Sequence, residues 1–367
     1  WCLGKRRGAA RCAGRGDESG SEHPHSAPGT TWGVLGVAGI NAAMVPAILA
    51  CEGATLRGIA SRDLARATAA AEDASAAAST PVRPYDGYDA LLADPEINAV
   101  YLPLPNAQHA PWAARAAIAG KHVLCEKPMA VTAAEAREMA ATADAAGVLL
   151  AEAFMYAHHP RYALVRQLIA DGAIGEVRQV HTTFTFDASS ELEHSGFQGA
   201  PGSGAIYDVG CYAVHVARTL IGAEPEAVTA HATRSALHGD VDMSTSLLLE
   251  FPGGVSSTAH LGMWNADLDT VLIMGSHHWI EIPHAFICGP NDSADIIIGG
   301  GSDSAEPRTI HVPPADHYAL QLARFGAAVR GEGELLYGVE DAVHQAAVLE
   351  AATRSWRERA RMPISAS

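Results

Sequence analysis

Two segments of the chain carry residues that could exchange a proton with a substrate oxygen. Lys127 closely follows a short apolar run, His122–Cys125, and Asp208 and Tyr212 lie four residues apart in a later segment. If that segment is helical, both side chains lie on one face. Taken singly, they also fit a surface lysine and a packed helix tyrosine. An ammonium, a carboxylate and a phenol together can perform acid–base chemistry, so we predict Lys127, Asp208 and Tyr212 as catalytic residues, with His215 as the alternative proton donor.

A glycine-containing turn after the first apolar run, residues 32–35, could hold a dinucleotide. Small residues allow backbone N–H groups to approach a pyrophosphate, and the N-terminus of the following helix stabilises its charge. Two usual glycines are replaced by Ala38 and Asn41, so the motif alone also fits an ordinary tight turn. Its place between a strand and a helix favours the cofactor interpretation. We predict cofactor contacts at Gly36, Ala38, Gly39 and Ile40.

The end of the second predicted strand bears on the choice of cofactor. Ser61 and Arg62 lie where an acidic residue would bind a ribose 2′-hydroxyl and repel a 2′-phosphate. A hydroxyl and a cation suit a phosphate instead. The alternative is a solvated Arg62 followed by Asp63 as a helix N-cap. We predict cofactor contacts at Ser61 and Arg62 and NADP as the cofactor, with NAD as the alternative.

Elements that could position these residues alternate regularly between residues 31 and 152. Short apolar runs separate alanine-rich stretches with helical spacing, as expected for parallel βαβ units. We predict an α/β fold in which residues 31–152 form a doubly wound, parallel Rossmann sheet that binds the dinucleotide beyond the carboxyl ends of its strands. The predicted strands are 32–35, 55–60, 99–102, 122–125 and 148–151, and the predicted helices are 42–50, 64–71, 111–119 and 133–145.

The pattern changes after residue 152. Longer strands follow one another without helices between them, which predicts a large, mostly antiparallel, open-faced sheet. We expect residues 153–367 to form an α+β domain for substrate binding, whose exposed sheet face is apolar and pairs subunits into a homodimer or homotetramer. The predicted strands are 177–186, 227–233, 244–251 and 255–261, and the predicted helices are 161–170, 212–220, 315–329 and 340–357.

Residues 1–30 are rich in Gly, Arg, Ser and Pro and lack hydrophobic periodicity, so they predict a disordered tail. The pair Arg6–Arg7 also fits a twin-arginine export signal, but no apolar segment follows it.

Composition excludes several classes of function. Lys and Arg number 25 against 41 Asp and Glu, and this net charge of −16 argues against nucleic acid as a partner. The sequence contains no run of about 18 apolar residues, so we expect no membrane-spanning helix. The six cysteines form no C-x-x-C pair, so we expect neither a disulfide framework nor a metal site. We also expect a cytoplasmic protein, because the reducing cytoplasm is the default for a chain without disulfides.

Six motifs in order resemble the glucose-fructose oxidoreductase and inositol dehydrogenase family (Gfo/Idh/MocA), from about residue 31 to 362. Within it, the chain is similar to the branch of glucose-fructose oxidoreductase, xylose dehydrogenases, dimeric dihydrodiol dehydrogenases and nucleotide-sugar ketoreductases. That branch has a tyrosine, here Tyr212, where inositol dehydrogenases have a histidine. Besides the glycine turn, the motifs are Leu104–His109, Glu126–Pro128, Glu152–Tyr156, Gly172–Val177 and Asp208–Tyr212.

The resemblance implies a role for each site residue. Lys127 would bind the substrate oxygen and lower the pKa of Tyr212, which exchanges the proton, while Asp208 orients the pair. The substrate contacts would be Lys127, Asp208 and Tyr212, with Tyr156 and His159 as further candidates. Cofactor contacts would include Leu102, Pro105, Asn106, His109, Glu126 and Lys127.

The predicted function is the NADP-dependent interconversion of a secondary alcohol or hemiacetal and a carbonyl. The substrate would be a sugar, a nucleotide-sugar or a cyclic polyol. Two alternatives stay open: a dinucleotide-binding sensor or co-repressor without turnover, and a redox-neutral sugar-processing enzyme that keeps NAD tightly bound.

Overall fold

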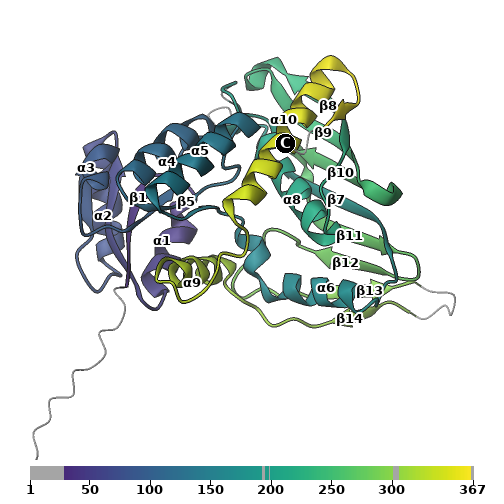
Figure 1. The fold of residues 1–367 in the computed structure, drawn as a ribbon, viewed down its shortest axis with the longest axis horizontal. Helices are drawn as coiled ribbons and strands as arrows, with labels where there is room; N and C mark the ends of the chain where they lie inside the picture. The colour runs from purple at the N-terminus through teal and green to yellow at the C-terminus, as the bar shows by residue number, and fades with distance from the viewer. Residues whose placement is uncertain (1–28, 192–194, 198, 301–305, 365–367) are drawn as a thin grey trace, which may run out of the picture.

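The computed structural model describes residues 29–191, 195–197, 199–300 and 306–364, which form two β-sheets with their helices (Figure 1). Of the predicted tail, residues 1–28 lie outside this range. Thr30, assigned to the tail, is instead the buried first residue of strand β1. Every helix among the described residues is too short or too polar to cross a membrane.

The first sheet is parallel, with strand order β3-β2-β1-β4-β5-β6, as predicted for a Rossmann fold. Strands β1 to β3 extend the sheet in one direction, and β4 to β6 extend it in the other, starting again beside β1. Ligands bind at such a switch point, beyond the carboxyl ends of the strands. The strands are β1 (Thr30–Leu35), β2 (Ala54–Ser61), β3 (Arg83–Asp86), β4 (Ala99–Leu102), β5 (His122–Cys125) and β6 (Leu150–Glu152).

The helices between these strands begin and end at recognisable signals. The Asp63 side chain accepts hydrogen bonds from the backbone N–H groups of Ala65 and Arg66 at the start of α2. Asp63 is therefore the helix N-cap that was considered as an alternative in this segment. Thr132 and Glu135 form a capping box at the start of α5, and Gly147 ends that helix in the left-handed conformation. The helices are α1 (Asn41–Ala50), α2 (Leu64–Ser75), α3 (Tyr88–Leu92), α4 (His109–Ile118) and α5 (Ala133–Ala146).

The second sheet has nine strands in the order β14-β13-β12-β11-β7-β10-β9-β8-β15. It is mostly antiparallel, as predicted, although β7 and β10 run parallel. The sequence analysis proposed no strands after residue 261, where the period-two pattern is weaker. The strands are β7 (Val177–Asp187), β8 (Ala227–Ser235), β9 (Val241–Glu250), β10 (Ser256–Gly262), β11 (Trp264–Gly275), β12 (Trp279–Pro283), β13 (Ile296–Gly299), β14 (Arg308–Ile310) and β15 (Met362–Pro363).

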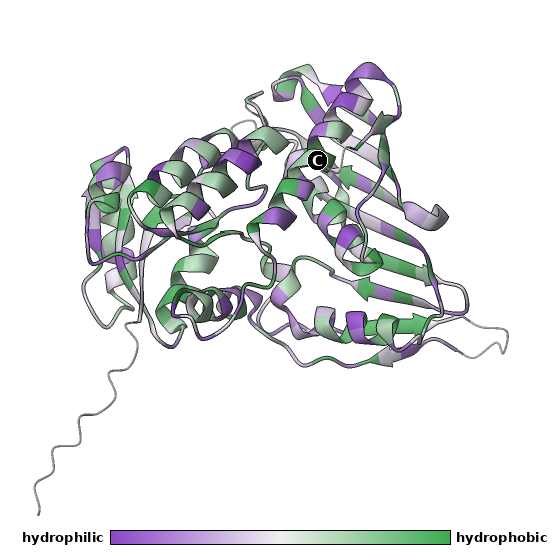
Figure 2. Cartoon of the chain, viewed as in Figure 1, coloured by the Kyte–Doolittle hydropathy of each residue, from purple (hydrophilic) through white to green (hydrophobic). Residues whose placement is uncertain are grey.

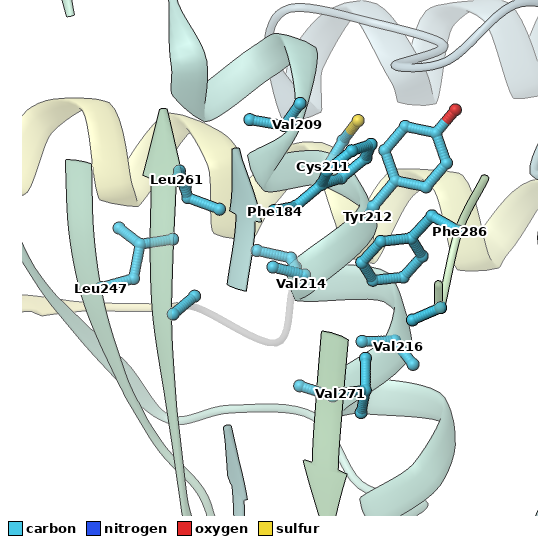
Figure 3. Packing of buried hydrophobic residues seen from close by; sticks show 14 of the residues in the cluster. Phe184, Val209, Cys211, Tyr212, Val214, Val216, Leu247, Leu261, Val271 and Phe286 are labelled. Carbon is cyan, nitrogen blue, oxygen red and sulfur yellow. The ribbon is translucent and has the colours of Figure 1, made fainter. Parts of the chain in front are cut away.

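One face of this sheet is covered by helices. Helix α8 packs against β7 and β10 and is buried along almost its whole length, and α10 packs against β8 (Figure 1). Val214 and Val216 of α8 meet Phe184 and Val271 of the sheet (Figure 3). The helices of this part are α6 (Pro160–Ala170), α7 (Ala205–Asp208), α8 (Gly210–Ile221), α9 (His317–Val329) and α10 (Val339–Glu358), and the short 3₁₀ turns are Asn106–Gln108, Met155–His158, Ser195–Phe197, Ala236–His238 and Pro252–Gly254.

The opposite face of the sheet is apolar only in part. Leu272 and Met274 of β11, Trp279 of β12 and Ile297 of β13 lie half-buried on it. Hydrophobic and hydrophilic residues alternate along strands of the sheet (Figure 2). Buried and more exposed residues alternate along much of β7 and β9, because successive side chains point to opposite faces and the apolar ones face the helices. Leu248 and Leu268 are the large apolar side chains exposed on β9 and β11. On β7 to β10 the other outward side chains are mainly hydroxyls and imidazoles, among them Thr183, His231, Ser246, Thr258 and His260.

The C-terminal segment contributes to both hydrophobic cores. Helix α9 packs against α1, and its Phe325 ring lies 5.4 Å from the ring of Trp32 in β1. Ala342 and Val343, near the start of α10, belong to the core between the first sheet and α5, whereas Leu349 belongs to the core of the second sheet. Residues beyond 153 therefore contribute to the second sheet and also to the hydrophobic cores around the first sheet.

Candidate active site

A cleft of about 540 Å³ lies between the carboxyl ends of the parallel strands and the junction of α7 with α8. Its lining residues come from loops and helices on either side of residue 153, and ligand pockets commonly lie at such junctions between domains. Its lining includes Ala38, Gly39, Ile40, Pro103–Ala107, Glu126, Lys127, Met155, Gly196, Ala200–Ser203, Asp208, Tyr212, Ile287 and Tyr318.

The glycine turn forms one end of the cleft and suits a dinucleotide pyrophosphate. Gly36 has a φ of +136°, and a Cβ atom there would lie 3.0 Å from a side-chain carbon of Leu104. Open space lies where Gly39 would carry a Cβ atom. Ala38, Gly39 and Ile40 line the cleft at the N-terminus of α1, whose first turn has no acidic residue. An anion is therefore favoured here by the helix dipole.

Polar groups at the end of β2 could contact the adenosine half of a cofactor. Ser61 is buried, and its hydroxyl oxygen accepts a hydrogen bond from the Asp63 N–H at 3.2 Å. Arg62 is exposed. Arg66, in the first turn of α2, was not predicted; its Nη2 donates to the Val37 carbonyl in the glycine turn at 2.9 Å. A second arginine shortly after Arg62 was the available signal.

The three predicted catalytic residues meet at the cleft. The Lys127 Nζ atom donates to the Asp208 carbonyl at 2.8 Å and to Asp208 Oδ1 at 3.1 Å. The same ammonium lies 4.9 Å from the centroid of the Tyr212 ring. The Tyr212 hydroxyl points out of the apolar cluster (Figure 3) and lies 3.6 Å from Met155 Sδ. Tertiary folding thus brings together an ammonium, a carboxylate and a phenol that are distant in the chain.

The helix expected through Asp208 and Tyr212 is interrupted. Helix α7 ends at Asp208, Val209 is the joint, and α8 begins at Gly210. Because the chain bends there, the Asp208 carbonyl is available to Lys127. The buried carboxylate of Asp242 anchors α7 by accepting the Ile206 N–H at 2.9 Å. Asp208 and Tyr212 therefore lie on either side of this joint and are linked through Lys127, not through a shared helical face.

Burial and charge set the protonation of the pair. Burial raises the pKa of Tyr212 well above its usual value, although the Lys127 ammonium opposes this. Burial disfavours the charged form of Lys127, but its neighbours Tyr212 and Asp208 raise its pKa well above the usual value. The predicted lowering of the Tyr212 pKa is therefore outweighed by burial. At neutral pH the pair is a neutral phenol beside an ammonium, an arrangement suited to donating a proton.

Three further predicted cofactor residues line the cleft. Glu126 accepts hydrogen bonds from the Tyr101 hydroxyl at 2.5 Å and from the Lys127 N–H at 3.2 Å, and burial raises its pKa. Pro105 and Asn106 lie on the loop after β4. The Asn106 side chain donates to the Gly202 carbonyl at 2.7 Å and so joins the two walls of the cleft.

Two predicted cofactor residues are fully buried instead. Leu102 belongs to the core beneath the cleft. His109 has no exposed surface, and its ring nitrogens lie 2.8 Å from the Pro128 carbonyl and 2.7 Å from the Leu104 carbonyl. His109 thus braces the two loops that carry cleft residues, and its side chain does not face the cleft.

The two further substrate candidates also lie away from the cleft. Tyr156 is 1% exposed, and its hydroxyl is 2.5 Å from His215 Nδ1. His159 is buried at the start of α6, where it accepts the Arg161 N–H. The cleft is lined instead by Met155, Ile287 and Tyr318. Ile287 and Tyr318 come from segments without a motif, so only the tertiary structure could reveal them.

Comparison with known proteins places this site in a family. The N-terminal model of an oxidoreductase family with an NAD-binding Rossmann fold matches residues 30–154, and a Gfo/Idh/MocA C-terminal domain model matches residues 162–281. The chain belongs to the Gfo/Idh/MocA family of oxidoreductases. The resemblance noted from the motifs is thereby confirmed.

Several named relatives act on sugars or nucleotide-sugars, and others are dihydrodiol dehydrogenases. A dTDP-3,4-didehydro-2,6-dideoxy-α-D-glucose 3-reductase of Streptomyces violaceoruber is 35% identical over 79% of this chain and 82% of its own. An NADP⁺-linked D-xylose 1-dehydrogenase of Haloferax volcanii is 34% identical over 81% and 88%. The structure of the 3-ketoreductase KijD10 from Actinomadura kijaniata with NADP and TDP-benzene is 30% identical over 89% and 98%, with a TM-score of 0.82.

Proposed function

We propose that this Gfo/Idh/MocA oxidoreductase uses NADP to interconvert a secondary alcohol or hemiacetal of a sugar or cyclic polyol with the corresponding carbonyl. The meeting of Lys127, Asp208 and Tyr212 in one cleft beside the glycine turn carries this proposal. Relatives that act on sugars and bear or use NADP support it. We further propose that residues 31–152 serve the cofactor and that residues 153–367 serve the substrate.

The site residues divide the acid–base work. When bound, the nicotinamide supplies or accepts the hydride. In the reducing direction, the neutral Tyr212 phenol gives its proton to the carbonyl oxygen. The Lys127 ammonium donates a hydrogen bond to the same oxygen and stabilises its developing negative charge. Asp208 keeps the ammonium in place. In the oxidising direction, Tyr212 acts as its phenolate, which the Lys127 ammonium stabilises, and it accepts the proton of the alcohol.

Cofactor choice rests on the end of β2. Ser61 would donate its hydroxyl to the ribose 2′-phosphate, and Arg62 and Arg66 would supply positive charge from α2. Arg66 is the better placed of the two, because it already bonds the backbone of the glycine turn. No acidic side chain occupies the position that would bind a 2′-hydroxyl.

The substrate side of the cleft favours an uncharged molecule. Its wall includes Met155, Ile287 and Tyr318, and Lys127 is the one cation among the described lining residues. That ammonium is already paired with Asp208. A nucleotide-linked sugar carries a diphosphate that would be better matched by arginines. We therefore rank a free sugar or a cyclic polyol above a nucleotide-sugar as substrate.

The proposed function is tested with Lys127→Met and Tyr212→Phe. A panel of free sugars, cyclic polyols and dihydrodiols is assayed with NADP⁺, and the keto forms and a dTDP-keto-sugar are assayed with NADPH. Each variant should lose at least 10³-fold in kcat, while the Kd of NADPH changes less than threefold. Lack of turnover by the parent protein across the panel would favour the sensor function, and NAD that copurifies and never exchanges would favour the redox-neutral one.

We also propose that two copies associate through the outer face of the second sheet. Most side chains of β8, β9 and β10 on that face are exposed. Leu248 of β9 and Leu268 of β11 are exposed apolar residues on the same face, near side chains with hydroxyl groups. Such a mixed face fits an interface of apolar and hydrogen-bonding contacts.

A further inference from the structure

A buried polar network lies behind Tyr212 and connects α8 with α10. Gln345 of α10 is 1% exposed, and its Nε2 donates to the carbonyl of Cys211, the residue before Tyr212, at 2.6 Å. Its Oε1 accepts from Arg218 Nη1 at 3.1 Å. The amide therefore uses both ends to hold α8, once at its first turn and once near its last.

Asp341, one turn earlier on α10, extends this network. Its Oδ1 accepts from Arg218 Nη2 at 2.9 Å, and its Oδ2 lies 3.4 Å from His215 Nε2. The other ring nitrogen of His215 is the one near the Tyr156 hydroxyl. Arg218 is also paired with Glu224 through two hydrogen bonds of 2.6 and 2.8 Å. Opposite charges thus compensate the buried guanidinium, as a buried ion requires.

The network ends on the rings that surround Tyr212. The Phe154 ring stacks on His215, with centroids 4.1 Å apart, and meets the Tyr212 ring edge-on at 5.5 Å. The Tyr156 ring lies 5.8 Å from the Tyr212 ring. Tyr212 is therefore held from two sides: through the carbonyl of the preceding residue, and through rings whose own positions depend on His215.

We propose that Gln345 and Asp341 are positioning residues that aim the Tyr212 hydroxyl at the reacting oxygen. The inference rests on the proposed function, because it gives Tyr212 the proton-transfer role. A displacement of about 1 Å at a reacting group can cost on the order of 10²-fold in rate, so the polar bond between Gln345 and α8 has a reason to be retained in an otherwise apolar core.

Gln345→Glu tests the donor bond separately from the arginine contact. A carboxylate still accepts from Arg218, but it cannot donate to the Cys211 carbonyl. We expect kcat on the best substrate of the panel to fall at least tenfold, with the Kd of NADPH within twofold of the parent value. In 3-fluorotyrosine-labelled protein, the Tyr212 ¹⁹F resonance, assigned by its loss in Tyr212→Phe, should shift more than the other tyrosine resonances.

The matched control lies on the same helix. Ser355 is fully buried in α10, donates to the Ala360 carbonyl at 2.6 Å and accepts from the Ala230 N–H at 2.9 Å, in contact with β8 and not with α8. Ser355→Ala should lower the unfolding midpoint while kcat and the Tyr212 resonance stay as in the parent. Equal loss of kcat in both variants at equal loss of stability would overturn the proposal, as would an unmoved Tyr212 resonance in Gln345→Glu.

A second variant covers failure of Gln345→Glu to fold. Asp341→Asn keeps the size of the side chain and removes the charge that faces Arg218 and His215, and we expect kcat to fall at least threefold with unchanged NADPH binding. A kcat within twofold of the parent would overturn the proposal. If the parent itself turns over nothing, the proposed function fails, but the ¹⁹F resonance of Tyr212 still decides whether α10 sets its position.

Discussion

Buried carboxyl groups near the site have opposite protonation behaviour. Burial raises the pKa of Glu152 to about 8, with one oxygen bound to the Met129 N–H at 2.8 Å and the other without a hydrogen-bond partner. Asp341 is also buried, but bonds and charges from His215 and Arg218 lower its pKa to about 2. The two pKa values differ because the Arg218 guanidinium bonds Asp341 directly and does not bond Glu152. A carboxylate stays charged in the interior where a cation accompanies it.

Replacing Glu152 should change how stability depends on pH. The folded protein retains a proton on Glu152 that the unfolded chain releases above its ordinary pKa near 4.5, so the free energy of unfolding falls as the pH rises from about 4.5 to 8. Glu152→Gln removes this dependence. Relative to the parent, the variant should gain about 3–4 kcal/mol between pH 5 and pH 8, measured by urea denaturation. A difference that does not change with pH would contradict the assignment.

Cofactor preference should be separable from catalysis at Arg62 and Arg66. Loss of a charge-assisted hydrogen bond to phosphate costs about 1.5–3 kcal/mol, roughly one to two factors of ten. Arg66→Ala should raise the KM for NADP at least tenfold and leave the KM for NAD within threefold, and Arg62→Ala should act in the same direction. Steady-state kinetics with both cofactors measures this. Equal effects on NADP and NAD would show that the arginines do not contact the 2′-phosphate.

Helix ends hold the elements that carry the site. The loop after β5, residues 126–132, carries the cleft residues Glu126 and Lys127 and leads into α5. The capping box at Thr132 and Glu135 satisfies backbone N–H groups that the first turn of a helix leaves free. A local signal in the sequence thus fixes where this loop ends.

Removing this cap should reduce stability and leave the chemistry unchanged. Thr132→Ala deletes the hydroxyl that accepts the Glu135 N–H at 3.1 Å and should cost about 1 kcal/mol. Chemical denaturation measures the loss, and kcat serves as the internal control. A fall in kcat of more than threefold would mean that the cap also sets the position of Lys127.

At the scale of the whole molecule, the exposed sheet face should govern assembly. If two copies meet there, Leu248→Glu places like charges at the interface and should convert a dimer to a monomer in sedimentation velocity experiments at micromolar protein concentration. His344→Gln, an exposed change on α10, is the control and should leave assembly unchanged. A monomeric parent at tens of micromolar, or a dimer that tolerates Leu248→Glu, would refute this interface.

The sequence alone determined the parallel sheet except for β3, and most of its helices, and it predicted Lys127, Asp208 and Tyr212, which the fold brings to one cleft. Alternating apolar runs and caps are local signals, and the functional motifs occupy short segments. Strands after residue 261 were missed because β11 has little regular alternation, with four exposed residues in a row, 265–268. Tyr156 and His159 were misplaced because a motif does not show which way its side chains point.

Only the tertiary structure decided which groups surround Lys127 and Tyr212. The return of α9 and α10 to the first core brings Tyr318 to the cleft and Gln345 to the Cys211 carbonyl, across 134 residues of chain. Such contacts leave no periodic pattern, because they depend on how separate elements pack and not on the conformation of any one of them. The balance of burial against charge at Tyr212 was decided in the same way, since desolvation is a property of the folded surroundings.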